Sequence, residues 1–128
     1  MDLNLDLITP KSADIVRKCD FCAAFDHNGK GFDNNNSEKC TGYFTNCASF
    51  NNRINYMLLY TFAKWDNNWS WNGKKAEQQG FIQTLKKPSN TNSVSKNFYS
   101  IRDQIIKTVM TNQFPDSITF DKAISSLN

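Results

Sequence analysis

Residues 19–47 read CDFCAAFDHNGKGFDNNNSEKCTGYFTNC, and this stretch holds all four cysteines of the chain and its only histidine. The first two cysteines are separated by two residues, the gap that lets a pair of thiolates reach one zinc ion. The second two are separated by six residues, so the closing half of such a site needs a wider loop. The stretch predicts a structural zinc site with the ligands Cys19, Cys22, Cys40 and Cys47, and with His27 in place of one cysteine as the second choice.

The case for a metal depends on the segment between the cysteines. Residues 26–42 are polar, include Gly29 and Gly31, and follow neither the helical nor the strand period of apolar residues, which predicts a long loop. Such a loop cannot bury enough apolar surface to hold itself, whereas the free energy of zinc binding would also be free energy of folding. Two alternatives stay open: a pair of disulfides, which suits a secreted protein, and four unlinked thiols.

Most of the remaining chain has the apolar spacing of helices. The strongest helix is predicted over residues 49–65, where apolar side chains recur every three or four positions at Phe50, Ile54, Met57, Leu58, Phe62 and Trp65. Helices are also predicted over residues 12–25, 76–85, 98–114 and 119–127, with an exposed connector over 86–96. Residues 2–8 alternate Leu with Asp or Asn, which predicts one half-buried strand. No internal repeat is evident.

These elements predict a small single domain over residues 1–128, mostly α or α+β, with three to five helices, an N-terminal strand and a loop clipped by the cysteines. The N-terminus lacks the basic and apolar regions of a signal peptide, and no window approaches the roughly 18 apolar residues of a membrane helix. We therefore expect an intracellular protein, cytoplasmic or nuclear, without a membrane partner. Disulfides would instead indicate secretion.

Residues 64–87 mix tryptophans with lysines. Aromatic side chains that stack on bases, next to cations that neutralise phosphates, are typical of proteins that bind single-stranded nucleic acid. The candidate contacts are Trp69, Trp71, Lys74, Lys75, Lys86 and Lys87. The alternative is structural, because Trp65 continues the apolar positions before it and the other two tryptophans could fold over the core. The net charge of +3 is too mild to identify a nucleic-acid partner by itself.

Motifs of phosphate-binding loops, metalloproteases and serine hydrolases are missing from the sequence, so an enzyme is the minority interpretation. The leading hypothesis is a small, non-catalytic accessory or regulatory protein that binds a larger protein or nucleoprotein, with the zinc clip as part of the contact surface. The alternatives are a nucleic-acid-binding protein and a small hydrolase or nuclease. Asparagine enrichment is typical of A+T-rich genomes and favours a viral or phage origin. The sequence does not indicate the oligomeric state.

Overall fold

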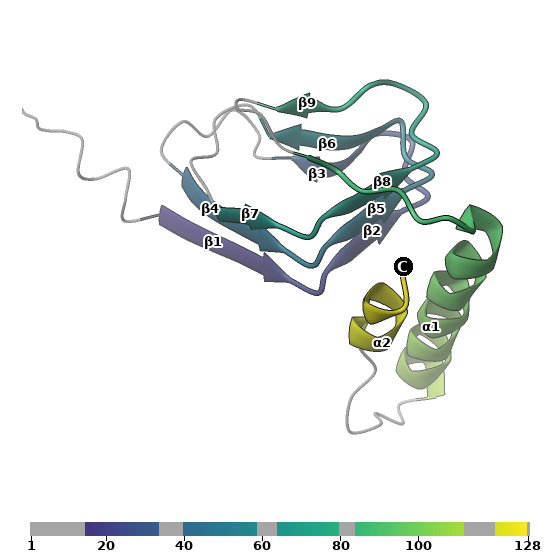
Figure 1. Ribbon diagram of the computed structural model, residues 1–128. Coiled ribbons are helices and arrows are strands. Elements are labelled where there is room, and N and C mark those ends of the chain that lie inside the picture. The colour runs from purple at the N-terminus through teal and green to yellow at the C-terminus, as the bar shows by residue number, and fades with distance from the viewer. Residues whose placement is uncertain (1–14, 34–39, 59–63, 80–83, 112–119, 128) are drawn as a thin grey trace, which may run out of the picture.

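The computed structural model in Figure 1 describes residues 15–33, 40–58, 64–79, 84–111 and 120–127. Within these ranges the backbone forms nine β-strands followed by two α-helices. The strands are β1 Ile15–Asp20, β2 Ala23–Phe25, β3 Lys30–Asp33, β4 Cys40–Thr45, β5 Ala48–Phe50, β6 Ile54–Leu58, β7 Lys64–Asp66, β8 Trp69–Trp71 and β9 Gln78–Gln79. The helices are α1 Thr91–Thr111 and α2 Asp121–Ser125.

The strands wind as three coils of a parallel β-solenoid (Figure 1). The first coil holds β1 to β3, the second β4 to β6 and the third β7 to β9. Equivalent strands of successive coils pair in parallel, so that β1, β4 and β7 form one sheet, β2, β5 and β8 a second, and β3, β6 and β9 a third. Beyond the third coil, Lys86 pairs with Trp69 and extends the second sheet by one bridge.

Two turns bend each coil, and a single residue with positive φ makes each turn. The first turn, between the first and second sheets, uses Phe21, Asn46 and Asn67 in the three coils, and the second turn uses Asp26, Asn51 and Asn72. Asn and Asp are the residues other than glycine that adopt this left-handed conformation most readily. Four of these six positions are asparagine, so the turns account for part of the asparagine enrichment of the chain.

The interior of the solenoid has an apolar part and a polar part. The apolar part consists of Phe44, Tyr56 and Leu58, with Cys19, Phe32, Trp65 and Leu85 packed against them. The polar part surrounds the second turn, where the Asn52 amide donates to the Ala24 carbonyl oxygen at 3.0 Å and the Asn55 amide donates to the Trp71 carbonyl oxygen at 3.1 Å. These buried amides therefore replace the water that the turn backbone loses.

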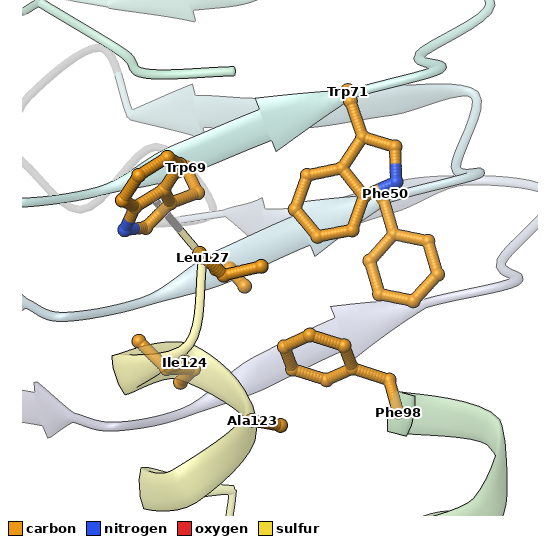
Figure 2. Close-up of a cluster of buried hydrophobic side chains, with 8 residues drawn as sticks. Phe50, Trp69, Trp71, Phe98, Ala123, Ile124 and Leu127 are labelled. Atoms are coloured by element: carbon orange, nitrogen blue, oxygen red, sulfur yellow. The ribbon is translucent and has the colours of Figure 1, made fainter. Parts of the chain in front are cut away.

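A second core lies outside the solenoid, between the second sheet and the two helices (Figure 2). Phe25, Phe50 and Trp71 occupy one register position in the three coils, and their rings stack in a column with centroid separations of 4.8 and 4.4 Å. Phe98 of α1 packs edge-on against the Phe50 ring at 5.3 Å. The remaining buried members of this core are Ala48, Trp69, Ala123, Ile124 and Leu127.

The predicted mostly α or α+β domain with three to five helices is wrong. The described residues within 49–65 form parts of β5, β6 and β7 instead of the strongest helix, and residues 15–25 form β1 and β2. The predicted loop over 26–42 contains β3 and the start of β4, held by backbone pairing with the neighbouring coil. The chain also has the internal repeat that was not evident in its sequence, with one coil as the repeating unit.

The helical predictions near the C-terminus fare better. The helix predicted over 98–114 is present in α1, which begins earlier, inside the predicted connector, and the last predicted helix is present as α2. Residues 76–79 belong to an extended segment that ends in β9 instead of a helix. The strand predicted over residues 2–8 lies outside the described residues. Among the described residues, no helix combines the length and apolar character needed to cross a membrane.

Candidate binding surfaces

Cys22, Cys47 and Asn68 occupy equivalent positions, directly after the first turn of each coil. The Cys47 thiol donates to the Cys19 carbonyl oxygen at 3.3 Å, and the Asn68 amide donates at 2.9 Å to the carbonyl oxygen of Phe44, which pairs with Cys19 in register. The two free thiols of Cys22 and Cys47 thus occupy the position of a turn-capping amide. This role explains two of the cysteines without a metal.

The prediction of a metal-binding protein is wrong for the part of the chain that the structure describes, because no three Cys, His, Asp or Glu side chains come together there as metal ligands. Cys19 packs against the apolar interior of the solenoid, whereas Cys22 and Cys47 follow the bend. The second-choice ligand, His27, is exposed in the turn after β2. Cys40 begins β4, and its side chain lies outside the described residues. Backbone pairing between coils holds β3 and β4, the described strands of the segment that was expected to need a clip.

Burial raises the pKa of the Cys47 thiol from 9.0 to about 12, and the neighbouring thiols of Cys22 and Cys19 act in the same direction. The thiolate is the nucleophile, and a thiol with this pKa is almost entirely protonated at neutral pH. Cys47 therefore acts as a hydrogen-bond donor inside the wall of the solenoid.

The two tryptophans expected at a contact surface are buried. Trp69 is 5% exposed and Trp71 is 2% exposed. Trp71 donates from its indole nitrogen to the Ser95 hydroxyl at 2.9 Å, which ties α1 to the second sheet, and Lys86 lies over the Trp69 ring with its nitrogen 5.1 Å from the ring centroid. Because neither indole reaches the surface, neither can stack on a bound base, and the structural alternative accounts for both.

The second half of α1 carries three exposed apolar side chains, which we call the α1 stripe. Ile106, Val109 and Met110 are 48%, 62% and 80% exposed. They follow the i, i+3, i+4 spacing of neighbouring positions on a helix surface, in the turns that follow the contact of Phe98 with the second sheet. Figure 1 shows this end of α1 extending away from the strands. The apolar spacing of the sequence had identified these residues as part of a single buried face, and it carried no signal that the strands end before this part of the helix.

A cluster of cations lies at the second turn, and we call it the basic corner. It consists of Arg53 from the second coil and Lys74 and Lys75 from the third, all of them exposed. Lys74 and Lys75 belong to the predicted contact residues, whereas sequence analysis missed Arg53 because only the pairing of coils brings it beside them. The other two predicted lysines, Lys86 and Lys87, are exposed on the strand segment that follows the third coil.

Two hollows in the surface lie on the helices. One, of about 280 Å³ between α1 and α2, is lined by Asn97, Ser100, Ile101, Lys122, Ala123 and Ser126. The other, of about 430 Å³ along α1, is lined by Lys96, Tyr99, Ser100, Asp103, Gln104 and Lys107. Neither brings two carboxylates together, as general acid–base hydrolysis of a glycosidic bond requires.

The fold and these surfaces define a small parallel β-solenoid, with helices packed on one sheet and with two surfaces of contrasting chemistry, one apolar and one cationic. The chain matches no protein-family model, no curated protein and no solved structure.

Proposed function

We propose that this protein is a non-catalytic accessory or regulatory module that binds another protein through the α1 stripe. The observation that carries the proposal is the exposure of Ile106, Val109 and Met110 on adjacent turns of one helix face. Single exposed apolar side chains are ordinary, whereas a contiguous group of them marks an interaction site. The stripe suits a partner with an apolar groove, into which a helix places side chains at this spacing.

The rigid base of α1 supports the proposal. Phe98 is fully buried against the aromatic column, and the Tyr99 hydroxyl donates to Asp26 at 2.8 Å while it accepts from Asn51 at 2.6 Å. Arg102 lies 3.2 Å from the same aspartate. The helix is therefore fixed to the second turns of two coils, and a partner would not have to order its first half on binding.

The test compares three forms of the full chain. The first is the wild type, the second carries Ile106→Gln, Val109→Gln and Met110→Gln, and the third is a control with Ser93→Ala, Gln104→Ala and Thr111→Ala at exposed polar positions of the same helix. We expect the wild type and the control to bind the same protein from extracts of the source cells, and the glutamine variant to bind it more than about tenfold more weakly. Hydrogen exchange of the purified complex should show protection at residues 105–111.

Two results would contradict this function. Equal binding by all three forms would show that the stripe is not the contact surface. A glutamine variant whose melting temperature falls by more than about 5 °C would show that residues of the chain itself cover the stripe, since exposed positions change stability little. Size-exclusion chromatography with light scattering separates a third case, self-association through the stripe, which would replace the partner protein with a second copy.

A further inference from the structure

The basic corner is built by the pairing of coils. The Lys74 backbone N–H donates to the Asn52 carbonyl oxygen at 3.0 Å, and the Lys75 N–H donates to the Arg53 carbonyl oxygen at 2.8 Å. Neighbouring strands lie about 4.8 Å apart, so the backbone holds Arg53 directly beside the two lysines. Figure 1 shows the second turns of the three coils lying side by side, which places these cations on one edge of the molecule.

Three carboxylates of the described residues near the second turns and the third sheet make other contacts. Asp26 pairs with Arg102 of α1 at 3.2 Å, and Asp33 pairs with Lys30 at 3.7 Å. The Glu77 carboxylate accepts a hydrogen bond from the Ser70 hydroxyl, which also contacts the buried amide of Asn55. In the described residues, Arg53, Lys74 and Lys75 form no ion pair. Like charges on neighbouring strands destabilise a sheet, so an anion bound here would relieve a repulsion built into the fold.

The surroundings of the cations favour a phosphate backbone over an acidic peptide. The exposed neighbours are His27, Asn28 and Gly29 in the first coil and Asn72 and Gly73 in the third, which provide polar groups and free space without a large apolar side chain. Protein partners usually contribute apolar or aromatic anchors that need a matching pocket, whereas phosphate contacts need charge and polar donors alone. The basic corner has only the second kind of group.

We infer that the basic corner binds the phosphate backbone of a nucleic acid without reading its bases. The buried tryptophans support the second half of this inference, because exposed aromatic rings are what proteins use to stack on single-stranded bases. The inference goes beyond the proposed function, since the basic corner and the α1 stripe share no residue. Together the two surfaces would suit a nucleoprotein assembly, with the protein component on α1 and the nucleic acid at the turns.

The number of cations fixes the expected salt dependence. Three neutralised phosphates give a slope of about −2.7 for the logarithm of the binding constant against the logarithm of the salt concentration on duplex DNA. Raising the salt from about 50 to about 200 mM should therefore weaken binding about 40-fold. Two duplexes of unrelated sequence should bind with equal affinity, because contacts to phosphates carry no sequence information.

The experiment measures fluorescence anisotropy of labelled duplex DNA with three forms of the full chain. One form is the wild type, one carries Arg53→Gln, Lys74→Gln and Lys75→Gln, and one is a charge-matched control with Lys96→Gln, Lys107→Gln and Lys122→Gln on the helices. We expect the control to keep at least half of the wild-type affinity. The corner variant should lose more than about tenfold at 50 mM salt, and most of the salt dependence should disappear with it.

Several results would overturn the inference. Equal losses in the corner variant and the control would mean that the net charge attracts DNA without a site. A clear preference for one of the two duplexes would mean that bases are read, and competition by polyglutamate at the same charge concentration would point to an acidic protein as the ligand. The α1 stripe variant should bind DNA as the wild type does, so that failure of the proposed function and failure of this inference are distinguishable.

Discussion

Asparagine has two roles in this protein, and they depend on different properties of its side chain. At the turns, Asn46 and Asn67 adopt positive φ, which costs asparagine less than other residues with a Cβ. In the interior, Asn52 and Asn55 are fully buried and donate to backbone carbonyl groups. The composition of the sequence revealed the abundance of asparagine, but the distinction between these roles requires knowledge of which residues lie at the turns.

Polar side chains at the first turns form a continuous hydrogen-bonded row across the coils. The Asn46 amide donates to the Asp20 carboxylate at 3.0 Å, the Asn67 amide donates to the Asn46 oxygen at 2.7 Å, and Lys86 donates to the Asn67 oxygen at 2.6 Å. Hydrogen bonds from Asn46 and Thr45 lower the pKa of Asp20, in accord with a carboxylate at the end of the row. Each coil is thus linked to the next by side chains as well as by backbone.

Gly31 is expected to tolerate a Cβ less well than Gly29 or Gly73. A Cβ at this position would lie 2.6 Å from the Asn52 amide nitrogen and 2.7 Å from the Asn55 carbonyl oxygen, and closer still to the Ser49 hydroxyl. All three neighbours belong to the buried polar network of the interior. Gly31→Ala should therefore lower the free energy of unfolding by about 2 kcal/mol or more, as measured by urea denaturation.

Gly29 provides the matched control, because a Cβ there would meet no atom within 4 Å. Gly29→Ala should leave stability unchanged or raise it by about 0.5 kcal/mol, through a smaller entropy of the unfolded chain. Similar losses for both substitutions would show that the interior is not packed as the polar network requires.

At the scale of elements, the helix predicted over 49–65 shows how a strand and a turn can imitate a helix. Ile54, Tyr56 and Leu58 alternate along β6 with the period of a strand. The second turn separates them from Phe50, which points to the helices, so the apolar positions of the whole segment come to recur every three or four residues. Periodicity identified α1 correctly because no turn of this kind interrupts it.

The repeat was hidden for a similar reason. The equivalent segments are CDFCAAFD, FTNCASFN and WDNNWSWN, residues 19–26, 44–51 and 65–72, and they share residue type more than identity. The intervals between them are unequal, which conceals a fixed period. Two cysteines that repeat one position in successive coils therefore resembled two halves of a zinc site. Of the candidate binding residues, only the lysines could be proposed from composition; Arg53 and the α1 stripe needed the fold.

The attachment of α1 to the second sheet should depend on Phe98. Its ring is fully buried and packs edge-on against Phe50 at 5.3 Å and against Trp71 at 6.0 Å. Phe98→Ala should cost about 3 to 5 kcal/mol of the free energy of unfolding, because it removes a large side chain from the centre of the outer core. Tryptophan fluorescence during urea denaturation measures this loss directly, since Trp71 reports on the same contact.

Val109→Ala, on the exposed end of the same helix, should cost less than about 0.5 kcal/mol. If this substitution proved as costly as Phe98→Ala, the end of α1 would have to be buried. A mild effect of Phe98→Ala would mean that the helices contribute little to holding the second sheet.

At the scale of the whole molecule, the second coil lies between the other two and is the most completely buried. Its strands β4, β5 and β6 pair on both sides, whereas those of the first coil pair on one side within the described residues. Every residue of β5 is buried, but the equivalent residues of β2 are only half-buried. In a solenoid each coil is stabilised mainly by its neighbours, so stability should be greatest in the middle.

Hydrogen exchange measured by mass spectrometry should reveal this gradient. We expect the amides of β5 and β6 to exchange at least about tenfold more slowly than those of β2 and β3. The reason is that the first coil can open while the second coil stays folded. Uniform protection in all three coils would contradict independent opening and would indicate that the solenoid and its helices unfold as a single unit.

The row from Asp20 to Lys86 has a direction, since every amide in it points its hydrogens toward the carboxylate and its oxygen toward the ammonium group. The carboxylate and the ammonium group at the two ends are each hydrogen-bonded to a neighbouring amide. Another coil could therefore be inserted between them if it carried an asparagine at its own first turn. The molecule is therefore extensible by whole coils, and tandem duplication of one coil, such as residues 43–63, is a route by which longer versions of this architecture could arise without new charged ends.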